Sequence, residues 1–145
     1  MTVSAHWYTK GLVAFLNKET DWNSDSIYCA LLDNTYTPAQ DTDAYWADVK
    51  AHEVTGTGYT ANGAALTSLV LTTGGTHEAQ MKAADTSWAS STITARYAVV
   101  YDRTPSTDAT RPLICYLDFG ADMSSTSGAF LIQWASGIVA KIAAA

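Results

Sequence analysis

TITARYAVVY, residues 92–101, is the stretch of the sequence with the most regular strand pattern. One set of alternate positions is apolar or aromatic (Ile93, Ala95, Tyr97, Val99 and Tyr101), and the other begins with Thr92, Thr94 and Arg96. Alternation among β-branched and aromatic residues is typical of a half-buried β-strand. We therefore predict a strand over residues 92–101.

A second apolar segment, RPLICYLDFG at residues 111–120, follows after the polar residues 102–110. Two strand-like segments joined by a polar loop form an antiparallel hairpin when both bury a face in the same core. We therefore expect residues 111–120 to pair with residues 92–101.

SIYCALL, residues 26–32, predicts a strand of a different kind, because the side chains on both of its faces are apolar or aromatic. A strand of this type is covered on both faces. Cys29 lies in this strand and Cys115 in the segment 111–120. Free cysteine behaves as a small buried hydrophobe, so we expect both thiols to be reduced core residues. Whether they ever pair depends on a distance that the sequence does not give.

The remaining segments complete a mostly β chain. An N-terminal helix is predicted by apolar residues at helical spacing, Tyr8, Leu12, Phe15 and Leu16, and a helical turn by residues 44–50. Further strands are expected at 52–60, 64–72, 78–85, 129–134 and 137–142, with turns at Asn62-Gly63 and Gly74-Gly75. The last two are the final apolar segments of the chain.

These elements predict an all-β fold with one short N-terminal helix. The expected architecture is an antiparallel β-sandwich or barrel of about seven or eight strands, in a single domain over residues 1–145. Jelly-roll, immunoglobulin-like and barrel topologies all fit this pattern.

Charged residues are few, at 15% of the chain, and the net charge is −6. Binding to a nucleic-acid backbone or to an anionic membrane requires clustered Lys and Arg. The eight basic residues are scattered, so we expect neither partner. The Thr, Ser, Ala and Gly that replace charges would form a surface that another protein can cover at low desolvation cost. Thr is also a good strand residue, which explains part of the composition without any partner.

The N-terminal stretch does not have the form of a signal peptide, because Lys10 interrupts a short apolar run and no cleavage site follows. No segment approaches the roughly 18 apolar residues of a membrane span. We expect the protein to be made in the cytoplasm without an export signal.

No motif predicts catalysis or a cofactor. His52 and His77 are each followed by Glu but lack the second His of a zinc-protease helix, and His6 lies near the N-terminus. A G-x-S-x-G nucleophile motif is absent, and we interpret the serine pairs 90–91 and 124–125 as polar loops. Gly56-Thr57-Gly58 is followed by turn residues, not by the helix of a dinucleotide site. We therefore predict a protein that is not an enzyme.

Four aspartates, Asp33, Asp41, Asp43 and Asp48, lie in one turn-rich region. Ca²⁺ prefers oxygen ligands gathered in loops, but the Asp-x-Asp-x-Asp-Gly pattern with a closing Glu is missing. We predict no metal site.

Tyr36, Tyr45 and Trp46 lie in or beside the loop that contains Pro38. Three interpretations fit these aromatics. Tyr and Trp dominate interface hot spots, so the three residues are our candidate protein-binding site. They could instead form a sugar-stacking platform, or a small core beneath a long loop.

Three stretches occur in a characteristic order: EVTGTGYTANGAAL (53–66), STITARYAVVYD (91–102) and PLICYLDFG (112–120). A short helix, SIYCALL and YTPAQDTDAYWADV (36–49) precede or border them. This combination resembles a family of small structural proteins of tailed bacteriophages and prophages, over nearly the whole chain.

The resemblance implies a virion component without enzymatic activity. The leading expectation is a capsid decoration (cement) or minor capsid protein on the outer capsid surface, whose partners are the major capsid protein or other virion proteins. A symmetric homo-oligomer, such as a trimer, would suit a local symmetry axis of the lattice. The alternatives are a tail-tip or minor tail protein, and a carbohydrate-binding module at the virion surface.

Overall fold

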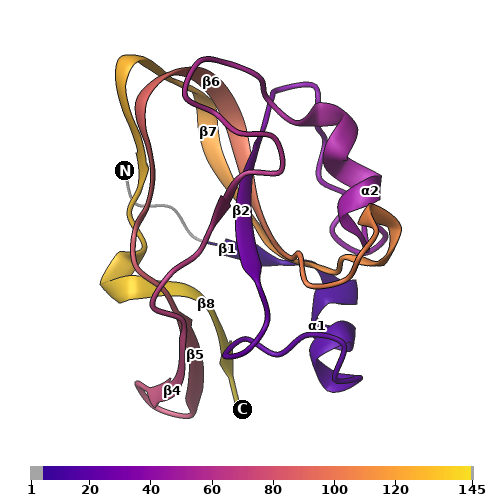
Figure 1. Cartoon of the computed structure of the whole chain (residues 1–145). Coiled ribbons are helices and arrows are strands. Elements are labelled where there is room, and N and C mark those ends of the chain that lie inside the picture. The colour runs from indigo at the N-terminus through magenta and orange to yellow at the C-terminus, as the bar shows by residue number, and fades with distance from the viewer. Residues whose placement is uncertain (1–4, 145) are drawn as a thin grey trace.

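The computed structural model describes residues 5–144 and confirms the all-β class (Figure 1). Strands make up 49% of the chain and helices 15%. The described strands are β1 (Ala5–Trp7), β2 (Ile27–Leu32), β3 (Ala64–Ala65), β4 (Val70–Gly74), β5 (Glu78–Lys82), β6 (Thr86–Asp102), β7 (Leu113–Ile132) and β8 (Ile138–Ala143). The helices are α1 (Thr9–Leu16) and α2 (Trp46–Val49), with 3₁₀ turns η1 (Lys50–His52), η2 (Asp108–Thr110) and η3 (Ala135–Gly137).

The strands form two antiparallel sheets. The large sheet has the order β1-β7-β6-β2-β3, and the small sheet has the order β4-β5-β8. The predicted hairpin is confirmed and is longer than expected, because β6 and β7 pair from Tyr101↔Leu113 to Thr86↔Ile132. The two sheets face each other as the layers of a sandwich, and α2 lies on the other side of the large sheet (Figure 1). Helix α1 lies at the lower end of the view, and its Phe15 packs against the core between the sheets.

Two apolar cores flank the large sheet, as the pattern of residues 26–32 predicted. Cys29 and Leu31 of β2 lie in the core between the two sheets, whereas Ala30 and Leu32 lie in the core beneath α2. All four side chains are fully buried. A strand that contributes to two cores needs apolar residues on both faces, which explains the composition of β2.

The two thiols are free and buried, as expected. Cys29 and Cys115 both pair with Val100, from opposite sides of β6. Two strand spacings separate them by about 10 Å, beyond the roughly 7 Å that a disulfide spans. Burial raises the pKa of Cys115 to about 12 and that of Cys29 still further. The fold therefore keeps both sulfurs apart and protonated.

The alternation in residues 92–101 does not continue on one face, which corrects the prediction. Ile93 and Ala95 lie in the core between the sheets, but Tyr101 and Val99 lie in the core beneath α2. A register shift between Ala95 and Tyr97 separates the two halves. Extra residues in one strand of a pair change which face the following side chains occupy. The bulge thus lets one strand fill both cores.

Helix α1 is present where it was predicted, but its buried face differs. Leu16 is 83% exposed, whereas Gly11 and Ala14 are buried against β7. A Cβ atom at Gly11 would lie 2.5 Å from the Leu113 carbonyl oxygen. The helix packs through its small residues because the backbone of β7 approaches so closely.

Other strand boundaries also differ from the prediction. Residues 52–60 form η1 and a loop with only isolated bridges, and residues 64–72 are divided between β3 and β4. Ser68, at φ 55°, interrupts the second segment. Residues 129–132 belong to β7 and pair with β6, whereas β8 pairs with β5, so the last two predicted segments lie in different sheets. Within the described part of the chain, every helix is too short or too polar to cross a membrane.

Candidate functional site

The candidate aromatic site is a core in this structure. Trp46 is fully buried and Tyr36 is 4% exposed, while Tyr45 is half-buried. The Trp46 ring stacks on Tyr101 at 4.5 Å between ring centroids with an interplanar angle of 6°. Its face is thus covered by another ring. The prediction of exposed hot spots is corrected for Trp46 and Tyr36, which cannot contact a partner or a sugar while this packing holds.

Polar groups of the same region close this core. The Tyr8 and Tyr36 hydroxyls lie 2.7 Å apart, and the Tyr36 hydroxyl donates to Asp43 Oδ2 at 2.7 Å. Burial raises the pKa of both phenols, so they stay protonated and can donate. Asp48 accepts from the Ala44 and Tyr45 N–H groups at the start of α2, each at 2.9 Å. These carboxylates hold the backbone in place.

The histidines lie apart from one another. His6 stacks on Tyr116 with 5.1 Å between ring centroids, and His52 Nδ1 lies 2.8 Å from Thr35 Oγ1. His77 occupies a turn at φ 58°. Across residues 5–144, no group of three or more His, Cys, Asp or Glu side chains is placed to hold a metal ion.

A polar cleft of about 350 Å³ lies between residues 53–55 and residues 92–94 of β6. Its only glutamate, Glu53, accepts from the Tyr59 hydroxyl at 2.8 Å and from the Asn62 N–H at 2.6 Å. Burial raises the pKa of Glu53. The carboxylate closes the loop 53–62 on itself, and the Tyr59 hydroxyl joins this loop to β2 by accepting the Leu31 N–H at 3.1 Å. The cleft therefore lies between a structural loop and a strand.

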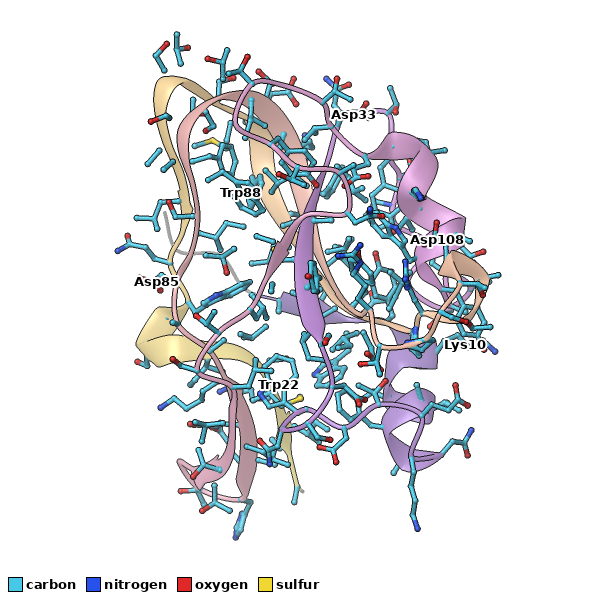
Figure 2. All side chains as sticks on the ribbon, viewed as in Figure 1. Lys10, Trp22, Asp33, Asp85, Trp88 and Asp108 are labelled. Atoms are coloured by element: carbon cyan, nitrogen blue, oxygen red, sulfur yellow. The ribbon has the colours of Figure 1, made fainter. Side chains whose placement is uncertain are left out.

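The far half of the β6–β7 hairpin has the most distinctive surface of the molecule. Residues 86–95 and 123–132 pair with each other beyond the reach of β1 and β2, which cover only residues 97–102 of β6 and 115–117 of β7. We call these two segments the hairpin arm. Its inner side enters the core between the sheets, where Trp88 and Phe130 are buried. Figure 2 shows Trp88 pointing from β6 toward the interior.

The outer side of the hairpin arm carries no charge. Neither segment contains Asp, Glu, Lys or Arg. The exposed residues have hydroxyl or apolar side chains: Ser87, Ala89, Ser90, Thr92, Thr94, Ser124, Thr126, Ser127, Ala129 and Leu131. Charges are depleted at the centres of protein interfaces, and short side chains lose little rotamer freedom when they are covered.

Hydrogen bonds between the strands hold these short side chains in place. The hydroxyls of Thr94 and Ser124 lie 2.8 Å apart, and those of Ser91 and Ser125 lie 2.7 Å apart. Ser91 is fully buried, which corrects the prediction that the serine pairs are loops. Part of the outer face is thus preorganised, because the Thr92, Thr94 and Ser124 hydroxyls have partners within the arm. The other exposed hydroxyls are open to a binding partner.

β-Bulges in the hairpin arm determine whether a partner can bind its edge or its face. Ser90 has φ 51° and Ser127 has φ 47°, and the register shifts at both places. Bulges twist an edge and discourage the addition of another strand. The arm therefore offers its outer face, and not a long straight edge, for contact.

Comparison with family models, curated proteins and solved structures gives no match for this chain. The hairpin arm is therefore identified as the candidate site from its geometry and composition alone. The composition already showed the excess of Ser and Thr, but adjacent serines resemble turns, so their gathering on one paired surface was missed.

Proposed function

We propose that this chain is a structural protein of a tailed-phage particle and acts without catalysis. In this proposal it decorates the outside of the capsid and binds the major capsid protein through the outer face of the hairpin arm. The observation that carries the proposal is the uncharged outer surface of short side chains on residues 86–95 and 123–132. The sequence resemblance to phage structural proteins supplies the setting.

The mechanism follows from mass action. A protein that binds the assembled shell and not its free subunits stabilises the shell in proportion to its occupancy. Because the contact is repeated at every lattice site, many weak contacts add up to a large stabilisation of the shell. A rigid face of short side chains suits this role, because each contact orders few rotamers.

Charge placed on the arm tests the contact. Ala129→Lys and Ser87→Lys each introduce a cation on the outer face, and neither side chain has a hydrogen-bond partner in the structure. Ser106→Lys is the matched control, because Ser106 is exposed in the loop at the other end of the same hairpin. The wild-type protein and the control should sediment with isolated heads, and the two arm variants should lose at least tenfold in affinity.

Equal binding by all four proteins would overturn the role of the arm. Gold labelling of intact particles distinguishes head from tail, and a label confined to the tail tip would overturn the decoration role in favour of a minor tail protein. Heads assembled with and without the protein should differ in resistance to heat. Equal resistance would contradict the stabilising mechanism.

A further inference from the structure

One end of the molecule exposes most of its large apolar side chains. Six such side chains stand out in the described structure, and five lie on α1 and the small sheet: Val13 (46%), Leu16 (83%), Val70 (48%), Leu71 (52%) and Ile142 (44%). The C-terminal end of α1, the β4–β5 hairpin and the end of β8 lie together at the lower end of Figure 1. Val70 and Leu71 are adjacent in β4 and point to opposite faces of the small sheet, so Val70 lies outside the surface discussed below. Single exposed apolar residues are ordinary, but a group of them marks an interaction surface.

The same end contains an apolar groove of about 450 Å³, between the end of α1 and the small sheet. Its lining is Phe15, Trp22, Leu71, Ala79, Met81 and Ile142, with Lys18, Thr20 and Asp21 at the polar margin. Leu71 pairs with Met81, and Ala79 pairs with Ile142, so these four share one face of the small sheet. Figure 2 shows Trp22 between α1 and that sheet.

The groove has a buried floor and exposed walls. Trp22 is 1% exposed and Met81 is 4% exposed, whereas Leu71 and Ile142 are about half exposed. The small sheet therefore extends past the core that it covers. Its overhanging part presents an apolar face that no described residue covers.

Charge is distributed unevenly between this end and the rest of the molecule. Residues 9–21, 70–82 and 138–143 contain four lysines and three acidic residues, a charge of +1. The chain as a whole carries −6, so the remaining residues carry −7. Two copies of an acidic protein repel least when they meet through the end that carries no net negative charge.

A protruding residue accompanies the groove. Leu16 is the most exposed of the large apolar residues and directly follows Phe15, which lines the groove. In a two-fold contact the same surface patch of both copies meets, so that patch must contain a protruding group and the cavity that receives it. This end of the molecule contains both, because Leu16 protrudes beside the apolar groove.

We propose that two copies of this chain pair about a two-fold axis through this end, with Leu16 of each copy inserted in the groove of the other. The pairing buries the overhanging face of the small sheet in both copies. It is separate from the hairpin arm and does not depend on the virion role.

The oligomeric state tests the proposal. Sedimentation equilibrium of the full chain should show a monomer–dimer equilibrium, and Leu16→Asp should weaken it at least tenfold. Leu131→Asp is the matched control, because Leu131 is the one strongly exposed large apolar residue on the hairpin arm, at 41%. It should dimerise like the wild type. Circular dichroism and thermal unfolding verify that each variant is folded.

Cross-linking locates the contact. A mixture of Leu16→Cys and Ala79→Cys proteins should form a disulfide-linked dimer on oxidation, because residue 16 of one copy would meet residue 79 in the groove of the other. Each variant alone should not, because its introduced thiols would not meet and its native thiols are buried. Cross-linking by Leu16→Cys alone would overturn the knob-in-groove arrangement. A wild-type protein that stays monomeric over a wide concentration range, or that forms a trimer, would overturn the two-fold pair. Ala129→Lys should leave dimerisation unchanged, which separates failure of this contact from failure of capsid binding.

Discussion

Asp102 is a carboxyl group at the end of β6 that the fold buries completely. Its Oδ1 accepts the Thr104 N–H at 2.8 Å, but its Oδ2 has no hydrogen-bond partner in the described structure. Burial, together with the neighbouring Asp25 carboxylate, raises the pKa of Asp102 to about 6, although the hydrogen bonds from Thr104 act in the opposite direction. The folded state therefore holds a proton that the unfolded chain releases near its ordinary pKa of 3.8.

This proton makes stability fall as the pH rises. Between about pH 4 and pH 6 the folded state binds more protons than the unfolded state, so the stabilisation present at low pH is lost through this window. We expect Asp102→Asn to remove this loss. Between pH 4 and pH 8, the free energy of unfolding of the wild type should fall by about 2 kcal/mol more than that of Asp102→Asn. Urea unfolding at both pH values measures it.

Glu19→Gln is the control for this experiment, because it removes an exposed carboxylate. Glu19→Gln should change the free energy of unfolding by the same amount at both pH values. An Asp102→Asn protein whose pH dependence matches that of the wild type would contradict the buried proton.

Gly11 gives a second prediction at this scale. Alanine normally stabilises a helix by about 1 kcal/mol relative to glycine. Here the new Cβ would lie 2.5 Å from the Leu113 carbonyl oxygen and 2.8 Å from that of Ile114, so α1 would have to move away from β7. We expect Gly11→Ala to destabilise the protein by about 1–3 kcal/mol in denaturant unfolding. Gly128→Ala, whose nearest neighbour is 3.6 Å away, should change stability by much less. A stabilised Gly11→Ala protein would refute the close approach.

At the scale of elements, the β6–β7 hairpin is held together by serines as well as by its backbone. The Ser91 hydroxyl lies 2.7 Å from Ser125 Oγ and donates to the Gly128 carbonyl at 3.0 Å, inside the bulged part of the arm. Ser91→Ala removes both contacts and leaves the half-buried Gly128 carbonyl and Ser125 hydroxyl without these partners, so we expect a loss of about 1–2 kcal/mol in the free energy of unfolding.

The exposed pair of the same arm provides the comparison. Ser124→Ala removes a hydroxyl that water can replace, so its effect should be within about 0.5 kcal/mol. If both variants lost the same amount, Ser91 would have no special role in the bulge. Chemical denaturation of both variants under one condition decides the matter.

The strands that the sequence predicted well are those whose local pattern agrees with their surroundings. Residues 26–32 and the core of the hairpin have apolar patterns that only a sheet satisfies, and the dipeptide Asn62-Gly63 turns with positive φ at both residues, as predicted. The predictions that were wrong concern features that depend on residues far away in the sequence. The bulge beside Arg96 depends on two cores sharing one strand, and the paired serines depend on a partner strand more than thirty residues away.

The candidate site was missed for the same reason. The loop around Pro38 gave no sign that Trp46 would find a stacking partner in Tyr101, because that partner lies in β6. Leu16 was assigned to the buried face of α1 on its spacing, whereas the approach of β7 selects Gly11 instead. Composition indicated an uncharged surface but could not place it on one side of a hairpin.

At the scale of the whole molecule, the two cores are joined by the strands that they share. Cys29 and Cys115 lie on either side of β6 in the core between the sheets, and both are fully buried. Both side chains lie in the core that the small sheet covers, so exposure of either sulfur requires the two sheets to separate. We expect this separation to occur only when the whole molecule unfolds.

Thiol reactivity measures this cooperativity. We expect a thiol reagent to modify both cysteines at the same rate, and the free energy of opening derived from that rate to equal the global free energy of unfolding. Its dependence on urea should match that of circular dichroism. A cysteine that reacts much faster than the other would show that one side of the large sheet opens alone.

The double burial of β2 also limits how this protein can change over generations. A strand at the surface of a sandwich has every second position free to drift, because water accepts almost any side chain there. In β2 five of the six residues are buried and Tyr28 is half-buried, so nearly every substitution meets neighbours on one side or the other. The hairpin arm has the opposite property, since half of its residues face outward. Descendants of this chain that adapt to a new partner should therefore differ first along the arm, and last in the six residues that hold both cores to one sheet.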